Sequence, residues 1–442
     1  MENVMQAGFA SLRMQPPLGL RIPGYYTVRL AEGTADPLHL RATALACGDV
    51  KAVIFNCECI GLNMGAYEII KKKVAEACDI DPESVYINCI HSHTSFIVVP
   101  AGPEMDDMDI HLLTIYQQFA DCAKLAFNDL KPATILSAIG ECKDFAFVRR
   151  YRMKDGTVRT NPPYGDENVV APIGKPDDHV RIVRIQREGA KEILIVHFGN
   201  HADMIGGKLY TPDWPGYLVA TLNRALEGNV ETMFLLGCEG DLNHRNFYNP
   251  MLTYKGVENA KFGARMVAGA VLRIYDKAIP SETNCLRFAH TYVQVGKNLW
   301  DPNRLDEVED LVQIYREKGE FAPELNKYPG LHYREALRIK ANLARPEFFN
   351  LRVSGIRVGD IAFIGLPGEP FASIGMDIVE RSTMPMTVVT AITNGYEGYY
   401  PDAAAFAEPG YSYEKSTSPF APDCAQKLID GAMEVLQQLQ AE

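Results

Sequence analysis

Short apolar runs alternate with helical periodicity along most of the chain. The runs are rich in β-branched residues and end in turn-forming residues, as buried strands do, and several lead into segments where apolar residues recur every three or four positions. This alternation predicts an α/β protein in which mixed β-sheets are flanked by helices. The predicted strands are 40–46, 52–56, 85–90, 134–138, 180–185, 193–198, 233–236, 351–358, 361–365 and 386–392. The predicted helices are 61–78, 110–130, 257–275 and 423–440, with others starting at Asp213 as an N-cap and directly after 366–371.

Three segments depart from this alternation. Apart from the predicted strands 40–46 and 52–56, residues 1–60 are expected to form turns and short strands. Residues 145–163 are basic and are expected to form a loop. Residues 302–345 are charged and strongly helical, with a break at Tyr328-Pro329-Gly330, and they predict a helical hairpin. We expect this hairpin to be either a cover over the site or a surface buttress. Because no repeat or linker is found, 1–442 is predicted to be a single large catalytic domain carrying the hairpin as an insertion.

Composition limits the partners of the protein. The 44 basic and 56 acidic side chains give a formal charge of −12, which argues against nucleic acid or an anionic membrane. No apolar run is long enough for a membrane span, and the N-terminus has no basic segment followed by an apolar one, as a signal peptide would. The ten cysteines include no CxxC pair, which argues against a zinc ribbon. A reduced, cytoplasmic protein without stable membrane insertion is therefore expected, and a homo-oligomer is left open.

Four predicted strands end in polar side chains that could bind a metal. Residues two apart on an extended chain face the same side, so the two histidines of the HSH tripeptide point together. Any one of these side chains could be structural at a strand end, but their shared position favours a metal site. Imidazole as the main ligand favours zinc over magnesium or calcium. The candidates are His91, His93, His201, Glu369, Tyr396 and Tyr399.

The order of these motifs is similar to that of a known family. NCIHSHTS, FGNHADMIGG, GCEGDLN, LPGEPF and TNGYEGYYPD resemble, in sequence and order, the motifs of the neutral/alkaline ceramidases, a family of zinc amidases. The N-terminal AGFASLRMQPPLGLRIPGY resembles the opening segment of the same family, so the resemblance spans essentially the whole chain. It implies the catalytic domain of a short bacterial-type member, a Zn²⁺ cofactor and hydrolysis of a linear amide C–N bond.

The resemblance also implies roles for individual residues. His91, His201, Glu369 and Tyr399 would bind the metal, with Tyr396 as the alternative to Tyr399.

Catalytic roles are implied in the same way. His93 would face the substrate carbonyl and stabilise its developing oxyanion. Arg149, with Arg150 as alternative, would be an active-site arginine, and Tyr413, with Tyr411 as alternative, would line the pocket. The general base is left open among Glu369, Asp203 and Asp241, and the two aspartates could equally orient His201 or cap local turns.

Two departures from the family pattern bear on mechanism and substrate. HSHTSF lacks the Gly-Pro of the family, and Asn243 stands where some family descriptions place a serine, which favours direct attack by metal-activated water. The chain ends after the helix near Gln440, so the immunoglobulin-like domain of secreted ceramidases is expected to be absent.

The substrate is expected to be a small-molecule or lipid amide. Ceramide or a related N-acyl lipid would need an apolar groove, which 96–99 and 396–406 could supply, although both could equally be core. The alternatives are a smaller soluble amide or ester, or a zinc-binding homologue that has lost turnover. A convergent phosphoesterase or sugar hydrolase would need more carboxylate ligands than these motifs supply.

Overall fold

Helices pack on one face of a large sheet, a smaller sheet packs on its other face, and further helices cover the smaller sheet. The computed structural model describes residues 4–25, 27–100, 107–249, 255–410 and 412–441. Three apolar cores separate the layers, one on each side of the smaller sheet and one beneath the outer helices of the large sheet. The predicted class, α/β with mixed sheets flanked by helices, is confirmed.

Nine of the described strands form the large sheet. Its order is β18 (Val230–Leu236), β16 (Glu192–Phe198), β15 (His179–Arg187), β10 (Lys131–Glu141), β1 (Met5–Met14), β5 (Leu38–Cys47), β6 (Val50–Cys57) and β8 (Val85–Cys89), with β20 (Ile279–Pro280) beside β10. The pairs at its two edges, β16–β18 and β6–β8, are parallel, and the pairs between them are antiparallel. Parallel neighbours end on the same side, so each edge of the sheet gathers two carboxyl-terminal strand ends.

The large sheet curls so that its two edge strands approach each other. Buried asparagines join them: Asn56 Nδ2 donates to Phe234 O at 2.6 Å, and Leu236 N donates to Asn88 Oδ1 at 2.9 Å. Asn88 Nδ2 also donates to Ala391 O at 2.7 Å, at the end of a strand of the smaller sheet. These buried amides of β6 and β8 bind backbone groups of β18 and of the end of a smaller-sheet strand, and so fix the relative position of those strands. The strand ends of both sheets therefore meet at one place.

The smaller sheet has the order β21 (Leu286–Gly296), β22 (Phe348–Val358), β23 (Ile361–Gly365) and β25 (Met386–Thr390). Its inner face, including Ile356 and Phe363, packs against large-sheet residues such as Ile54 and Tyr86. Its outer face is covered by α7 (Ala372–Arg381) and α10 (Cys424–Gln440). Residues of β23 are buried on both faces, which explains the uninterrupted apolar run of 361–365.

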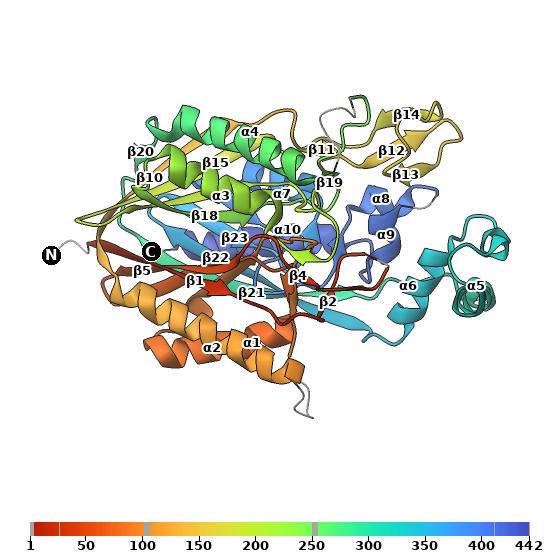
Figure 1. Ribbon diagram of the computed structural model, residues 1–442, viewed down its shortest axis with the longest axis horizontal. Helices are drawn as coiled ribbons and strands as arrows, with labels where there is room; N and C mark the ends of the chain where they lie inside the picture. Colours follow the sequence, from red (N-terminus) through yellow and green to blue (C-terminus); the bar gives the residue numbers. More distant parts are fainter. Residues whose placement is uncertain (1–3, 26, 101–106, 250–254, 411, 442) are drawn as a thin grey trace.

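Four helices cover the outer face of the large sheet (Figure 1). They are α1 (Met64–Cys78), α2 (Asp107–Asn128), α3 (Asp213–Ala225) and α4 (Val257–Tyr275). The apolar side of α1, with Tyr67, Ile70 and Val74, is buried, while Lys72 and Lys73 lie on its partly exposed side. An apolar stripe of this kind at helical spacing is what a helix needs to pack on a sheet.

A helical hairpin joins β21 to β22. It consists of η3 (Pro302–Arg304), α5 (Leu305–Lys318), η4 (Pro323–Asn326) and α6 (Tyr333–Leu343). It has its own small core, which includes Val308, Leu311 and Ile339, and its α6 contacts α9 (Tyr413–Thr417). Its ends are adjacent, since Lys297 N donates to Glu347 O at 2.8 Å. The prediction of one domain with this hairpin as insertion is untested and stays a prediction.

Short elements complete the described chain. They are β2 (Arg21–Ile22), β3 (Arg29–Leu30), β4 (Gly33–Thr34), β7 (Gly61–Leu62), η1 (Pro82–Ser84), β9 (Ile97–Val98), β11 (Phe147–Val148), β12 (Arg150–Met153), β13 (Val158–Thr160), β14 (Val169–Pro172), β17 (Leu209–Tyr210), β19 (Leu242–Asn243), β24 (Glu369–Pro370), β26 (Tyr399–Tyr400) and α8 (Ala403–Ala407). None of the described helices combines the length and the apolar character that crossing a bilayer requires.

Several expectations about local structure were wrong. Segment 145–163 contains β11, β12 and β13 rather than a loop, because β12 pairs with β13 and β14 in a separate small sheet. The N-terminal region begins with the ten-residue β1, and β21 was not predicted because its side chains are half-exposed without alternation. Asp213 is the first residue of α3 at φ 54°, not its N-cap, and its carboxylate accepts from Ile205 N at 2.7 Å.

Candidate metal centre

The strand ends of both sheets bring buried imidazole, carboxylate and phenol groups together. His91 and His93 follow β8, His201 follows β16, and Glu369 lies in β24, which pairs in parallel with β26 so that Glu369 is opposite Tyr399. Each of the five is at most 7% exposed. Residues far apart in the sequence thus meet because the large sheet curls and the smaller sheet packs against the strand ends of the large sheet.

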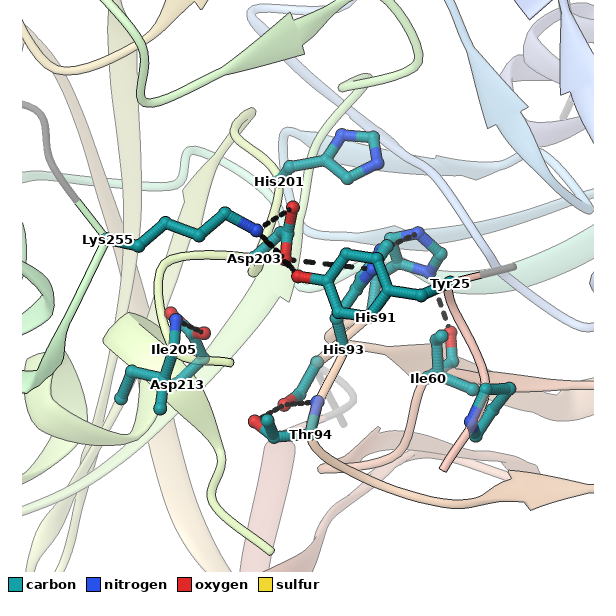
Figure 2. Close-up of polar contacts among 12 residues, drawn as sticks. Tyr25, Ile60, His91, His93, Thr94, His201, Asp203, Ile205, Asp213 and Lys255 are labelled. Atoms are coloured by element: carbon teal, nitrogen blue, oxygen red, sulfur yellow. Dashed lines mark hydrogen bonds and ion pairs between the residues drawn. The ribbon is translucent and has the colours of Figure 1, made fainter. Parts of the chain in front are cut away.

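His91 turns inward through an uncommon backbone conformation. It has φ 62°, which is sparsely populated for a residue with a Cβ and often marks a functional position. Its backbone N donates to Cys59 O at 3.1 Å, and its Nδ1 donates to Ile60 O at 2.9 Å (Figure 2). A hydrogen on Nδ1 leaves the lone pair on Nε2, which therefore faces the centre as a metal-ligating nitrogen would.

His201 is oriented in the same way. Its Nδ1 donates to Glu239 O at 3.0 Å, so its Nε2 also carries a lone pair. Trp214 Nε1, on α3, donates to the backbone carbonyl of His201 at 3.0 Å. Burial, and then the positive charge of Arg149, lower the pKa of His201 to about 4, so the ring is neutral at physiological pH. Neutral imidazole is the form that binds a metal.

The spacing of the ligand atoms fits a small cation. Glu369 Oε2 lies 3.3 Å from His91 Nε2 and 3.2 Å from His201 Nε2, and Tyr399 Oη lies 3.4 Å from His201 Nε2. Four ligands at zinc bond lengths of about 2.0–2.1 Å in a tetrahedron lie about 3.4 Å from one another. His91, His201, Glu369 and Tyr399, the four residues that the sequence resemblance implied as ligands, therefore form a set of suitable size.

The charge and burial of Glu369 also favour a bound cation. Burial raises the pKa of Glu369, whereas positive charge on His91 and His201, which these rings carry only when protonated, would hold it well below its usual range. With both rings neutral, the positive charge that keeps this carboxylate ionised has to come from a bound cation. Among the residues that the structure describes, Glu369 Oε2 has no hydrogen-bond partner although it is fully buried. An ionised oxygen facing two nitrogen lone pairs is costly in a dry interior unless a cation lies between them. The residues present thus fit a bound metal ion.

Glu239, which sequence reasoning overlooked, is a further carboxylate at this centre. It follows β18, is fully buried, and neither of its carboxylate oxygens has a hydrogen-bond partner among the described residues. Single ligand atoms of His91, Glu239 and Glu369 lie within 4.8 Å of one another. Burial and the charge of Glu369 raise the pKa of Glu239 well above its usual range. Its position at a strand end in GCEGD was the signal that could have identified it.

His93 belongs to the same cluster and also lines the cavity: single ring nitrogens of His91, His93 and His201 lie within 4.8 Å of one another. Its Nε2 is 3.2 Å from His91 Nε2, and its ring lines the cavity. Its Nδ1 lies 3.8 Å from Asp203 Oδ1, and Lys255 Nζ binds the same oxygen at 2.7 Å (Figure 2). The Tyr25 hydroxyl also contacts Asp203. Burial, and then His91 and His201, lower the pKa of His93 well below its usual range.

The two candidate tyrosines have different surroundings. Tyr396 Oη donates to the second oxygen of Glu369, Oε1, at 3.0 Å, whereas Tyr399 Oη lies on the His201 side of the ligand group. Burial and the charge of Glu369 raise the pKa of both phenols well above the usual range. Tyr413 lines the cavity with its ring 5.6 Å from that of Tyr399. Tyr411, its alternative, lies outside the described residues.

The two neighbouring arginines are separated by the structure. Arg149 lines the cavity, and its Nε donates to Glu414 Oε1 at 2.7 Å while its Nη2 donates to Gly240 O at 2.7 Å. Arg150 points elsewhere, to Glu408. Glu414 is fully buried and also accepts from Thr160 Oγ1 at 2.7 Å, so Arg149 is held by a satisfied carboxylate.

Asp241 lies beside the site rather than in it. Its Oδ1 accepts from Ala372 N, in the first turn of α7, at 2.8 Å. Burial raises its pKa to about 6. It is not among the described residues that line the cavity. This contact corresponds to the alternative that Asp241 caps a local turn.

A cavity of about 360 Å³ leads to the centre. It is lined by His93, Arg149, Asp203, Tyr399, Tyr413 and, from the hairpin helix α6, Arg334, together with Gly24, Tyr25, Thr160 and Asn161. A Cβ on Gly24, at φ 99°, would lie 2.6 Å from His93 Nδ1, so only glycine lets the N-terminal segment pack against that ring.

A larger cavity of about 700 Å³ lies elsewhere, between β1, β5 and α3, and contains none of these groups.

Fold and site together define a mixed α/β protein with a candidate metal centre where its strand ends converge. No protein-family profile and no curated protein matches the chain significantly. Among solved structures, the neutral ceramidase from Pseudomonas aeruginosa aligns with a TM-score of 0.71 and 15% identity over 100% of this chain and 76% of that one. A ceramidase complexed with C2 aligns with a TM-score of 0.67 and 14% identity over the same shares. The chain has a neutral ceramidase-like fold, as its motifs implied.

Proposed function

We propose that the protein is a zinc-dependent hydrolase that cleaves an amide C–N bond with water. The observation that carries this proposal is a buried group next to the cavity in which Glu369 Oε2 lies 3.2–3.3 Å from His91 Nε2 and His201 Nε2, and Tyr399 Oη lies 3.4 Å from His201 Nε2. Zinc bound there would supply a Lewis acid that polarises a carbonyl and acidifies water. The likeness of the fold to neutral ceramidase supports amide cleavage.

The chain's own groups supply orientation and charge. His93 presents a neutral ring to the cavity beside the ligand group, where it can donate a hydrogen bond to the oxygen of a carbonyl under attack. Arg149 brings a fixed positive charge to the same cavity wall, since Glu414 and Gly240 hold its guanidinium. Removing one donor to a developing oxyanion typically costs about 3–4 kcal/mol of transition-state stabilisation.

The reaction balances without a further reactant. Water adds its oxygen to the carbonyl carbon, the C–N bond breaks, and the products are a carboxylic acid and an amine whose nitrogen takes the proton from water. Glu369 and Glu239 are the buried carboxylates nearest to this exchange, and Glu239 has no hydrogen bond to lose on turning towards it. We assign the proton transfer to one of these two, and Asp203 to the orientation of His93 through its contact at 3.8 Å.

The test measures zinc and turnover together. Purified protein should carry close to one zinc per chain by elemental analysis and should hydrolyse a simple N-acyl amide. His91→Ala and His201→Ala should each lose the metal, and Tyr396→Phe, which removes a hydrogen bond to Glu369, should weaken zinc binding about 10–100-fold. His179→Ala, an exposed histidine of β15, is the matched control and should keep the metal.

Three results would contradict the proposal. Full zinc occupancy in both His91→Ala and His201→Ala would mean that the ligands are wrong. Loss of zinc in His179→Ala as well would mean that the metal is bound on the surface. Stoichiometric zinc without turnover on a panel of amides and esters would instead support a metal-binding protein that has lost catalysis.

A further inference from the structure

The cavity wall is polar and aromatic throughout its described part. None of the ten described lining residues has an aliphatic hydrocarbon side chain, and three of them are tyrosines. Phe96 and Val98, from the segment that could have formed an acyl-chain groove, are buried in the core among the helices α1 and α2. A long hydrocarbon chain would meet no matching surface here, and a cavity of about 360 Å³ is near the lower limit for ligand sites.

The charges in the wall favour an anion. Two of the three charged lining residues other than His93 are arginines, although the whole chain carries −12. Arg149 is matched by the buried Glu414, and Asp203 is matched by Lys255 at 2.7 Å. Arg334 extends into the same wall from the hairpin helix α6; its Nη2 lies 3.7 Å from Glu320 Oε2, and both side chains are about a third exposed. Arg334 thus adds a partly exposed positive charge to the cavity wall, where a ligand in the cavity can reach it.

The fold fixes where the Arg334 guanidinium lies. Arg334 is in the first turn of α6, which contacts α9, and α9 carries Tyr413 of the same cavity wall. Its Nε donates to Tyr333 Oη at 2.9 Å, and the Tyr333 ring stacks on Tyr315 of α5 at 5.5 Å. The hairpin thus places a positive charge in the wall of the cavity that His93 also lines, on a helix with its own core. A planar guanidinium binds a carboxylate through two parallel hydrogen bonds.

We infer that the substrate is a small, water-soluble N-acyl amide that carries a carboxylate, as N-acyl amino acids do, and that Arg334 binds this carboxylate. The inference rests on the proposed amide hydrolysis and adds the class of substrate. Arg334 is a specificity-determining residue in this assignment: it holds the end of the substrate that does not react, while the scissile carbonyl lies at His93.

The experiment compares N-acetylglycine with its methylamide, which has the same shape without the charge, and with long-chain ceramide in mixed micelles. The zinc-loaded protein should have kcat/KM at least tenfold higher for N-acetylglycine than for the methylamide. Arg334→Gln should lower kcat/KM for N-acetylglycine at least tenfold more than for the methylamide, mainly through KM, because a charged hydrogen bond is lost. Arg334→Lys should recover part of that loss, and Arg316→Gln, an exposed arginine of α5, should have no such effect.

Binding separates this inference from the proposed function. Titration calorimetry should detect N-acetylglycine binding that Arg334→Gln weakens about tenfold or more, whether or not the protein turns the compound over. Hydrolysis of amides without a preference for the carboxylate, or ceramide turnover equal to that of N-acetylglycine, would overturn the inference and leave the hydrolase standing. Arg334-dependent binding without hydrolysis of any amide would support the anion site and overturn the hydrolase.

Discussion

His91 and His201 each donate from Nδ1 to a backbone carbonyl at about 3 Å, and this tautomer decides how the centre is interpreted. With hydrogens on Nδ1, both Nε2 atoms face Glu369 as acceptors, at 3.3 and 3.2 Å. Three acceptors around one point favour a cation, whereas two protonated rings would form ordinary ion pairs. The backbone carbonyls of Ile60 and Glu239 therefore do as much to define the site as the ligands themselves.

Not every buried histidine of the chain belongs to this site. His197, in β16, is buried, donates from Nε2 to Val389 O at 2.8 Å, and lies outside the ligand group. Burial, and then the charge of Arg181, lower its pKa to about 4 from an unperturbed value of 6.5. Between these values the unfolded chain binds a proton that the folded chain does not, so stability rises with pH across that range.

A pH dependence of stability follows for His197. The free energy of unfolding should fall by roughly 3 kcal/mol from this residue as the pH drops from 7 to 4. In His197→Gln the amide can donate to Val389 O but does not titrate, so its stability should fall less steeply. Urea unfolding of both proteins at several pH values measures the difference. Parallel profiles would mean that His197 does not carry this linkage.

At the scale of elements, the site depends on close contact between the end of β18 and β24. Gly240 N donates to Pro370 O at 2.9 Å, and Gly240 O accepts from Arg149 Nη2 at 2.7 Å. A Cβ at Gly240 would lie 2.4 Å from Glu369 O and 2.9 Å from Pro370 O. Both obstacles are backbone atoms, which cannot turn away as a side chain can. Gly240, the second glycine of GCEGD, is thus required because the two segments that carry Glu239 and Glu369 pack closely there.

Gly240→Ala should therefore displace β24 and Glu369 with it. We expect the free energy of unfolding to fall by about 1–3 kcal/mol, the usual range for overpacking, and zinc binding to weaken. Gly269→Ala, in α4, is the control, because a Cβ there meets nothing within 4 Å. Urea unfolding and zinc titration of both variants give the comparison. Equal zinc affinity in Gly240→Ala and the parent would show that β24 tolerates the shift.

At the scale of the whole molecule, the hairpin is attached to the rest of the chain at one place. It enters and leaves between β21 and β22, whose residues Gly296 and Phe348 are paired, and its core is separate from those of the sheets. Its described contact with the rest is mainly α6 on α9, next to the cavity. This arrangement favours the interpretation of the hairpin as a cover that carries Arg334, over a buttress that the sheets need for folding.

Excising the hairpin tests that interpretation. Replacing residues 299–346 by a short glycine-containing turn keeps Asn298, whose N donates to Pro419 O at 2.8 Å. The shortened protein should unfold cooperatively and keep its zinc, because closing a shorter loop changes the chain entropy little. It should lose the preference for N-acetylglycine over the methylamide. Loss of zinc or of cooperative unfolding would identify the hairpin as part of the structural core.

The sequence by itself determined most elements and the ligand types. The strand 361–365 and the helix 257–275 were predicted with their observed bounds, because continuous apolar runs and clear helical periodicity reflect burial directly. β21 was not predicted because its half-exposed side chains give no alternation, and the strands within 145–163 were not predicted because they are short and rich in arginine, although most of β12 is buried. Polar groups at strand ends suggested a metal site, and the resemblance to the ceramidase motifs then singled out His91, His201, Glu369 and Tyr399 as expected ligands.

Only the tertiary structure decided how these groups meet. The curl of the large sheet, held by Asn88, brings the ends of β8 and β18 together, and no local pattern encodes that long-range contact. It also added Glu239 to the centre, separated Arg149 from Arg150, and placed Arg334 of a distant hairpin in the cavity wall. Residue type fixes which chemistry is available, whereas the packing of strands from all parts of the chain fixes which groups face one another.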